Sequence, residues 1–418
     1  MAANQTDYVI AGGSAAGMAA ACAIREKDPG GRVTVLSEEA DPPYFRPMIP
    51  FLISGKKKVE EMALLGEGPY RKADIQLQLN ARVDHIDLTA QTVNAGKVGS
   101  FPYDKLLITT GSRPYVPPDI GGIDGSGVFA LRTLADARKA RLRALDTRHA
   151  VMLGGGLLNL KAAFALLERN IEVTLVVRSP EVLSQLMEPE DAVLIRRALD
   201  DAGLKIRTGV SAIDIHANGS GVAGVDLDDG SKIDCQMVCI GKGVRPNTDF
   251  LDPQTVEIDG GVVTDRYTAC STPDLFAAGD VAVTYDPISG EPIVTGLWTH
   301  AVEMGRCAGA NMAGCPTVYS GTFGILNATQ VANMPFVSMG IVHTRGTDHE
   351  VHVTESGSAY RKLVFSPDGN RLVGVVMVGD IAKAGLYRLV IRERMPVSKL
   401  KKEIIRHTLH YGHFIGKP

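Results

Sequence analysis

The chain has 418 residues, 45% of them hydrophobic, and it can bury more than one core, because a single core stops growing at about 250 to 300 residues. We expect two or three domains. Lys and Arg number 44 against 47 Asp and Glu, a formal charge of −3, which excludes nucleic acid as the main partner. Without a signal-like N-terminus or an apolar run of about 18 residues, the sequence predicts a cytoplasmic protein with no membrane partner.

The chain begins with a pattern of strand, glycine turn, helix and strand. Apolar residues 8–11 predict a first strand, residues 18–27 an alanine-rich helix, and residues 33–36 a second strand. The turn between strand and helix consists of Gly12, Gly13, Ser14, Ala15, Ala16 and Gly17. This is a complete βαβ unit.

The residue types in this turn suit a dinucleotide. Gly12 permits the tight turn, the small Ser14 lets the backbone approach a pyrophosphate, and Gly17 lets helix and strand pack closely. The helix N-terminus near Ala15 offers unpaired N–H groups to the diphosphate. Glu38, after the second strand, is placed to accept hydrogen bonds from the adenosine ribose.

A second copy of the pattern occurs further along the chain. It comprises a strand at 150–153, a helix at 160–169 and a strand at 173–177. Its turn is formed by Gly154, Gly155, Gly156, Leu157, Leu158 and Asn159. Such repetition makes a chance match improbable, so the sequence predicts two nucleotide-binding domains.

The segments around the second unit divide the chain. An apolar strand at 106–111 is followed by a proline-rich stretch, and we expect a domain boundary near Pro117. From about Gly321, short strands with turns such as that at 366–369 lead to a final amphipathic helix over 397–410. This part predicts a third domain.

These features resemble the pyridine nucleotide-disulfide oxidoreductase family with the glutathione-reductase-type fold. The resemblance covers nearly the whole chain and rests on the two glycine turns, Thr110-Gly111, the run from Gly241 through GVRPN, and TPDLFAAGDVA at 272–282. It implies an α/β protein with two Rossmann-type nucleotide-binding domains and a C-terminal α+β domain. The implied domains are FAD-binding at 1–117 and 246–320, NAD(P)-binding at 118–245, and C-terminal at 321–418.

The same resemblance implies the residues that contact FAD. Asp280, after Gly279, takes the position that in this family binds the ribitol of FAD. The segment at 44–55 is similar to NADH:rubredoxin reductases and to the flavin portion of assimilatory nitrite reductases, in which Arg46 and Pro47 would line the flavin. Thr110 and Gly111 complete the expected contacts in this part of the chain.

A helix late in the FAD domain is implied to face the flavin ring. Its N-terminus would stabilise the negative charge of the reduced ring, and it begins at Leu297, Trp298 and Thr299. Arg46 and Trp298 are therefore the candidate catalytic residues. Trp298 is also the only tryptophan, and simple packing of its ring is an equally good interpretation.

The second glycine turn departs from the family pattern. Asn159 replaces a glycine or alanine, and Lys161 replaces a glutamate that lies near the nicotinamide. Val177 stands where an acid would bind the ribose 2′-OH, and Arg178 either pairs with a 2′-phosphate, favouring NADPH over NADH, or is a surface arginine. The expected NAD(P) contacts are Gly154, Gly155, Gly156, Leu157, Leu158, Val177, Arg178 and Gly241.

Neither the cysteines nor the histidines predict a redox-active thiol pair or a metal site. The stretch 40–55, where disulfide-reducing relatives carry a cysteine pair, has none, and Cys235 and Cys239 alternate onto one face of an apolar strand. We expect no thiol relay. His407, His410 and His413 are interrupted by Gly412 and fit a solvated basic tail, so no metal is expected.

The resemblance implies hydride transfer from NADH or NADPH to FAD and onward transfer of electrons to a rubredoxin-like, ferredoxin-like or other iron–sulfur protein, or to a small acceptor. Nine Lys and Arg against two acids from 383 to 418 favour an acidic protein partner. Two alternatives stay open: an NAD(P)H oxidase or diaphorase, and a FAD-bound electron-transfer subunit of a larger complex that no longer binds NAD(P)H. Monomer and homodimer are both compatible with the sequence.

Overall fold

The computed structural model describes residues 5–64, 73–321 and 325–415. The chain divides into two compact units. Unit 1 comprises Met1–Tyr115, Arg132–Arg138 and Val244–Thr322, and unit 2 comprises Val116–Leu131, Lys139–Gly243 and Phe323–Pro418. The three-domain division expected from the sequence stays a prediction. Within the described ranges, no helix is both long enough and apolar enough to span a membrane.

The main sheet of unit 1 has five parallel strands. Their order is β19 (Leu275–Ala277), β7 (Lys105–Ile108), β1 (Asp7–Ala11), β2 (Arg32–Leu36) and β3 (Ile75–Gln78). The central strands are apolar and almost fully buried, as parallel strands covered on both faces must be. The carboxyl ends of β1, β2, β7 and β19 therefore meet at one edge.

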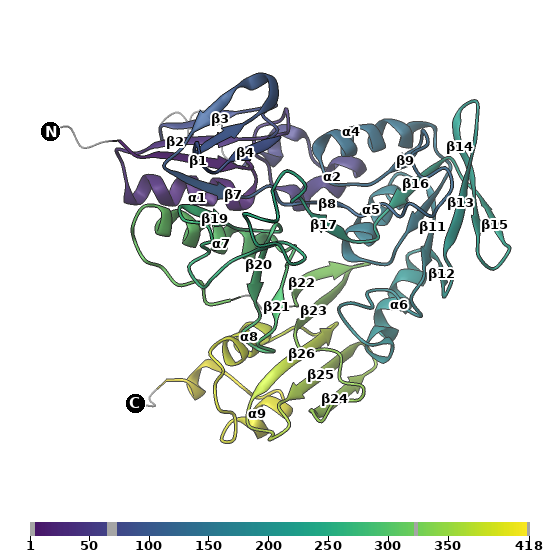
Figure 1. Ribbon diagram of the computed structural model, residues 1–418. Coiled ribbons are helices and arrows are strands. Elements are labelled where there is room, and N and C mark those ends of the chain that lie inside the picture. Colours follow the sequence, from purple (N-terminus) through teal and green to yellow (C-terminus); the bar gives the residue numbers. More distant parts are fainter. Residues whose placement is uncertain (1–4, 65–72, 322–324, 416–418) are drawn as a thin grey trace. The chain divides into compact units, whose positions relative to one another are not determined.

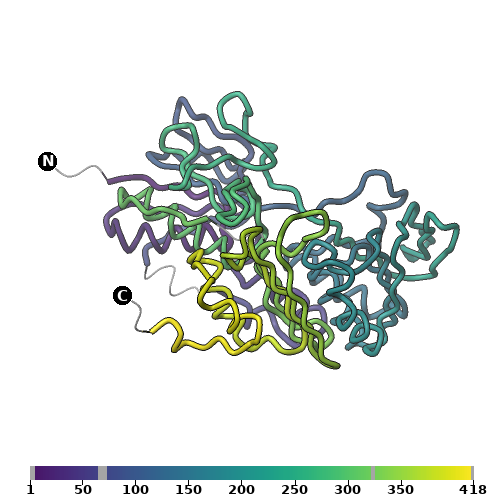
Figure 2. The backbone as a smooth tube through the Cα atoms, turned by 90° about the horizontal axis from the view of Figure 1, so that it is seen from below, coloured from purple at the N-terminus to yellow at the C-terminus, as the bar shows by residue number. Residues whose placement is uncertain are grey.

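Two helices lie side by side next to this sheet, α1 (Ala15–Lys27) and α7 (Trp298–Met312), as Figures 1 and 2 show. Their backbones approach closely because small residues line the contact. A Cβ at Gly305 would lie 2.1 Å from the Ala16 carbonyl oxygen, and one at Gly309 would lie 2.4 Å from that of Ala20. Glycine is required at both positions.

The remaining elements of unit 1 are small. A three-stranded antiparallel sheet contains β4 (His85–Asp87), β5 (Thr92–Asn94) and β6 (Ser100–Pro102). The proline-rich stretch after β7 is partly a strand, since β8 (Ser112–Pro114) pairs with β17 (Val244–Pro246). The other elements are α2 (Ile49–Ser54), β18 (Val262–Val263), β20 (Ala282–Tyr285) and β21 (Pro292–Ile293).

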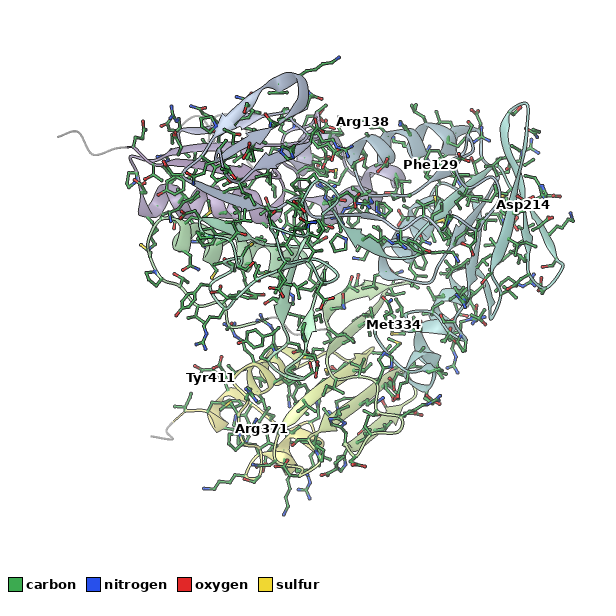
Figure 3. All side chains as sticks on the ribbon, viewed as in Figure 1. Phe129, Arg138, Asp214, Met334, Arg371 and Tyr411 are labelled. Atoms are coloured by element: carbon green, nitrogen blue, oxygen red, sulfur yellow. The ribbon has the colours of Figure 1, made fainter. Side chains whose placement is uncertain are left out.

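Unit 2 contains a second parallel sheet. Its order is β12 (Lys205–Thr208), β11 (Glu172–Val177), β10 (His149–Leu153), β16 (Met237–Ile240) and β9 (Val128–Phe129). The helices are α5 (Leu157–Leu167) and α6 (Val193–Asp201), and α4 (Leu134–Arg143) has residues in both units. An antiparallel meander follows, with β13 (Ala212–Asn218), which carries the labelled Asp214 of Figure 3, β14 (Gly221–Leu227) and β15 (Lys232–Asp234).

The rest of unit 2 is an antiparallel sheet with two helices. The strand order is β22 (Leu326–Val331), β23 (Met334–Gly340), β26 (Leu372–Val378), β25 (Ala359–Phe365) and β24 (Glu350–Ser356). The helices are α8 (Ala384–Arg392) and α9 (Lys401–Ile405). The expected turn at 366–369 is confirmed, because the Gly369 N–H donates to the Ser366 carbonyl at 2.7 Å.

The prediction of a single amphipathic helix over 397–410 is wrong. Only Lys401–Ile405 is α-helical there. His407 has a φ of +59°, and the N–H groups of Thr408 and Leu409 both donate to the Glu403 carbonyl, which closes the helix after little more than one turn. The longer helix, α8, precedes the predicted range.

Candidate functional site

The first glycine turn is packed too tightly for side chains. Gly12 has a φ of +126°, and a Cβ there would lie 2.1 Å from the Thr109 carbonyl oxygen at the end of β7. A Cβ on Gly17 would lie 1.9 Å from the Gly12 carbonyl oxygen, and one on Gly13 would lie 2.9 Å from the Cβ of Ser37. The Thr109 hydroxyl donates to Gly12 O at 2.9 Å. The turn is therefore held between the ends of three neighbouring strands.

Asp280 lies beside this turn. Gly279, with a φ of +80°, would place a Cβ 3.1 Å from that of Ala16 in the first turn of α1. Oδ2 of Asp280 accepts hydrogen bonds from Ser112 Oγ and from Arg132 Nη2, both at 2.9 Å. Within the described residues, no group donates a hydrogen bond to Oδ1. One carboxylate oxygen is fixed and the other is available.

Arg46 belongs to a half-buried polar cluster. Its Nη2 lies 2.6 Å from Glu39 Oε1, and its Nη1 donates to the Tyr44 hydroxyl at 2.9 Å and to the Arg132 carbonyl at 2.6 Å. The Tyr44 hydroxyl donates to Glu39 Oε2 at 2.6 Å. Burial by itself would lower the pKa of Arg46, but Tyr44 and Glu39 raise it, so the guanidinium stays charged.

Arg132 is a site residue that sequence reasoning missed. It lies two residues before the start of α4, and a Cβ on Gly111 would lie 3.5 Å from its Nη2. Asp136 fixes the start of the helix by accepting N–H bonds from Arg132 and Thr133 at 3.1 and 2.8 Å. This capping pattern is visible in the sequence, but the pairing of Arg132 with an aspartate 148 positions later is not.

The Thr110-Gly111 pair is held by Asn247. The Thr110 hydroxyl donates to Asn247 O, and Asn247 Nδ2 donates to Thr110 O, each at 2.9 Å. Gly111 has a φ of +66°. The pair therefore forms the sharp turn that leads the chain from β7 into β8, beside Arg132 and Asp280.

Trp298 begins α7 and packs on the Arg46 segment. Its ring centroid lies 4.8 Å from that of Phe45 at an interplanar angle of 74°, an edge-to-face contact. Leu297 is the N-cap residue and provides no side-chain cap, Thr299 is exposed, and Pro47 lies in a short 3₁₀ turn with Arg46. The structure thus brings the two predicted catalytic residues into one region of unit 1.

Glu38 lies just beyond the end of the second strand. It follows β2 by two residues, its side chain is exposed, and its Oε1 lies 3.5 Å from Arg82 Nη1. An exposed carboxylate at the end of the second strand is where the first Rossmann unit would meet a ribose. Its role stays a prediction.

In the second glycine turn, Asn159 is accommodated by a glycine on the neighbouring strand. Asn159 is 3% exposed, and its Nδ2 donates to the carbonyls of Leu153 and Gly154 at 2.9 and 2.8 Å. A Cβ on Gly241 would lie 2.4 Å from Asn159 Cγ. The amide therefore fills space that Gly241 leaves free and satisfies two carbonyls at the end of β10. At Gly156 nothing lies within 4 Å of a Cβ position, so the turn is open there.

The other predicted nucleotide contacts surround this turn. Val177 is buried, and its γ-methyl groups would lie 3.1 Å from a Cβ on Gly155. Arg178 is exposed. Lys161 is half-buried in α5, where burial lowers the pKa of its side chain, and none of the described residues forms a hydrogen bond or ion pair with its ammonium group. Leu157 and Leu158 occupy the first turn of α5.

Cys235 and Cys239 are buried, and the C-terminal histidines contact Tyr387 or one another. Burial raises the pKa values of Cys235 and Cys239 to about 12, so both thiols stay protonated. His407 Nδ1 lies 2.7 Å from the Tyr387 hydroxyl. The rings of His410 and His413 lie at the two ends of a short 3₁₀ turn, with their centroids 3.9 Å apart and an interplanar angle of 46°. Among the described residues, no three His, Cys, Asp or Glu side chains lie together in a group that could hold a metal ion.

Comparison with protein families identifies the family of this chain. Residues 6–305 match the family described as pyridine nucleotide-disulphide oxidoreductase. The chain belongs to this family. Residues 326–395 match the rubredoxin NAD+ reductase C-terminal domain, and this range contains all of the five-stranded antiparallel sheet of unit 2 and α8.

The similarity of the chain to individual proteins supports the same family assignment. The chain is 30% identical over 412 residues to the NADH-dependent phenylglyoxylate dehydrogenase subunit epsilon of Aromatoleum evansii, covering 98% of this chain and 97% of the relative. It is 28% identical over 375 residues to the nitrite reductase [NAD(P)H] large subunit of Klebsiella oxytoca, covering 89% of this chain but 38% of that subunit. Among solved structures, the ferredoxin reductase for the CYP199A2 system of Rhodopseudomonas palustris matches with a TM-score of 0.86 at 25% identity, covering 94% of this chain and 96% of that one.

The predicted family, its rubredoxin-reductase and nitrite-reductase subgroup, and the α/β fold are confirmed. As a member of the pyridine nucleotide-disulphide oxidoreductase family, the chain is an oxidoreductase that works with a flavin and a nicotinamide nucleotide. The roles of the individual contact residues stay predictions.

Proposed function

We propose that the chain binds FAD in unit 1 and NADH or NADPH in unit 2, and that it passes electrons from the nucleotide through the flavin to a small redox protein. The observation that carries this proposal is the position of Asp280 beside the Gly12–Gly17 turn, with Oδ2 held by Ser112 and Arg132 and Oδ1 available. A carboxylate that is already held in place next to a pyrophosphate-type turn suits the hydroxyl-rich ribitol chain of FAD. Its available oxygen can accept hydrogen bonds from ribitol hydroxyls without any movement of the side chain.

The groups around this position fit a dinucleotide with a flavin ring. The N-cap Ser14 makes no side-chain bond to the first turn of α1, so the N–H groups there suit a diphosphate. When bound, FAD supplies hydride acceptance from the nicotinamide and release of electrons to the acceptor. Arg46, tied to Glu39 and to the Arg132 carbonyl, and the ring pair of Phe45 and Trp298 would orient the ring system.

The geometry of the second glycine turn supports a site that still binds NADH or NADPH. Asn159 sits below the turn, bonded to Leu153 and Gly154, and leaves the approach at Gly156 open. Gly241 leaves room for the Asn159 side chain, so the turn keeps its fold although Asn159 replaces a smaller residue. The relative from Aromatoleum evansii, named as NADH-dependent, also favours nucleotide use over a nucleotide-free electron-transfer subunit.

The C-terminal helices offer a surface for an acidic acceptor. We define this cationic face as the basic side chains on and around α8 and α9: Arg388, Arg392, Arg394, Lys399, Lys402 and Arg406. All but Arg388 are exposed, and across the described residues the only ion pair that they form joins Arg392 to Glu393 at 3.7 Å. Unpaired charge of one sign steers an oppositely charged protein and is screened by salt. An acidic iron–sulfur or rubredoxin-like protein fits this face.

We place this activity in the cytoplasm, where reduced nicotinamide nucleotides and reduced thiols coexist. The six cysteines are all unpaired in the structure. Burial raises the pKa of Cys307 to about 11 and that of Cys270 to about 12, so both thiols stay protonated.

The proposal is tested by identifying the bound flavin and its acceptor. FAD, not FMN, should be released from the purified protein on denaturation. Reduction of an acidic rubredoxin or ferredoxin by NAD(P)H should slow with rising salt, and Arg392→Glu with Lys402→Glu should slow it about tenfold, whereas Lys97→Glu, an exposed lysine in unit 1, should leave it unchanged. Rapid reduction of oxygen with no reduction of either protein would instead indicate an oxidase.

A further inference from the structure

The last turn of the described chain carries apolar side chains that the fold leaves uncovered. Tyr411 and Ile415 are 66% and 65% exposed, and Phe414 is half-buried. We call these three residues the apolar turn, and Figure 3 labels Tyr411. Within the described part of the chain, no residue forms a hydrogen bond or a ring contact with the Tyr411 side chain. Apolar side chains that lie exposed together mark a site of interaction, whereas single scattered ones do not.

The apolar turn is held in place by its own hydrogen bonds and by a buried residue before it. The Gly412 N–H donates to His410 Nδ1 at 3.1 Å. The Phe414 N–H donates to the Tyr411 carbonyl at 2.9 Å. Leu409, two residues before Tyr411, is fully buried. A partner that binds such a turn therefore pays little entropy for ordering it.

Contacts with α8 join the start of this segment to the cationic face defined above. His407 Nδ1 lies 2.7 Å from the hydroxyl of Tyr387 on α8, and Nζ of Lys383, the N-cap residue of α8, donates to the His407 carbonyl. Lys402 and Arg406 are four positions apart at α9 and are both exposed, so they lie on the same side of the helix. The apolar turn begins five residues after Arg406, and it therefore borders the cationic face within unit 2.

The charge around the apolar turn favours an acidic partner. No acid occurs in the sequence from Arg406 to Ile415. Two acids lie near the start of this segment: Asp380, whose Oδ2 is 3.7 Å from His407 Nε2, and Glu403, which is half-buried. An acidic protein would meet apolar side chains bordered by positive charge, whereas a basic protein would be repelled by the cationic face.

We propose that the apolar turn is the centre of the surface that binds the acidic redox protein, with Tyr411 as its main anchor and the cationic face as its charged border. The inference rests on the proposed function and identifies the contacts that hold the acceptor. Charges at the border of an interface mainly steer the partner, whereas a few buried aromatic and apolar side chains near the centre supply most of the affinity.

Reduction of an acidic rubredoxin and of an acidic [2Fe–2S] ferredoxin by the flavin-loaded protein tests the proposal. In Tyr411→Ser and in Ile415→Ser the KM for the redox protein should rise about tenfold, and the rise should persist at high salt because burial of apolar surface is not screened. Tyr411→Phe, which keeps the ring, should retain most of the affinity. The rise caused by Arg392→Glu with Lys402→Glu should instead shrink with salt.

Leu142 provides a matched control. Its side chain on α4 is 66% exposed, the same fraction as that of Tyr411, but α4 is not part of the proposed surface. Leu142→Ser should therefore leave the KM for the redox protein unchanged. Ferricyanide, a small acceptor that needs no docking surface, measures in each variant whether electrons still pass from the nucleotide through the flavin.

The outcomes separate failure of this inference from failure of the proposed function. A salt-resistant rise in KM in Tyr411→Ser and Ile415→Ser, absent from Leu142→Ser, supports the inference. If the KM in the two turn variants equals that of the unaltered protein while charge reversal still slows the reaction, the inference is overturned and the proposed function stands. Reduction of ferricyanide without reduction of either redox protein would overturn both the inference and the assignment of a protein acceptor.

Discussion

Lys362 offers a direct test of what holds unit 2 together. It lies on β25 and is 2% exposed, yet its Nζ contacts the Glu188 carboxylate, lies 3.4 Å from Asp191 Oδ2 and donates to the Val342 carbonyl at 2.9 Å. The Tyr360 hydroxyl donates to Asp191. One buried cation therefore stabilises two buried carboxylates that come from the short turn before α6.

Replacing Lys362 by methionine keeps most of its volume and removes its charge. The two carboxylates then remain buried without a cation, and loss of one partner from such a group costs about 3 to 5 kcal/mol of the free energy of unfolding. The pKa of Glu188 shows the same stabilisation of the charged carboxylate. Burial raises this pKa, but the bond from Lys362 and the N–H groups of Thr344 and Arg345 lower it from 4.5 to about 2.

The sign of the pH dependence follows from that lowered pKa. In the unaltered protein the stabilisation is complete above about pH 4.5, the ordinary pKa of Glu188, and is lost as the pH falls towards 2. In Lys362→Met, burial acts unopposed by the lysine and the carboxylates take up protons at higher pH. The difference in stability between the two proteins should therefore be largest at neutral pH and narrow on acidification.

Urea unfolding at several pH values measures this difference. At neutral pH the midpoint for unit 2 should fall strongly in Lys362→Met, change little in Lys232→Met, which removes an exposed pair with Asp226, and partly recover when Glu188→Gln is added to Lys362→Met. A neutral-pH midpoint equal to that of the unaltered protein, or a loss that is the same at every pH, would refute the reasoning.

Three further substitutions address the two glycine turns. Gly17→Ala, whose Cβ would lie 1.9 Å from the Gly12 carbonyl oxygen, should yield protein with less than half the bound flavin, read from visible absorbance. Arg132→Met removes one of the two hydrogen bonds that hold Asp280 Oδ2, and it should weaken flavin binding about tenfold in a dialysis or fluorescence titration. Gly241→Ala should destabilise unit 2 by about 1 to 3 kcal/mol in urea unfolding, because Asn159 occupies that space, and adding Asn159→Gly should restore stability.

The features that the sequence could predict are those with a local signature. The two glycine turns follow buried strands and precede alanine- or leucine-rich helices, so spacing alone identifies both parallel sheets. Asp280 is recognisable because the continuous motif of Gly279 and the strand before it resembles the corresponding segment of the family. The family and the class of reaction follow from that resemblance.

The features that could not be predicted depend on partners distant in the chain. Arg132 contacts Asp280, which is 148 positions away in the chain, and Lys362 contacts Glu188, which is 174 positions away. The sequence alone does not show that a lysine in a strand is buried, because most lysines are exposed. Asn159 is visible as a departure, but its match with Gly241 is not. The helix predicted over 397–410 fails because its apolar spacing continues past the positive φ of His407 that ends it.

The anaerobic titration of the flavin with NADH and NADPH tests the central claim most directly. The absorbance of the oxidised flavin should be lost on addition of NADH or NADPH. A flavin that dithionite reduces but neither nucleotide does would contradict the claim, and would mean that electrons reach this chain from a protein partner instead.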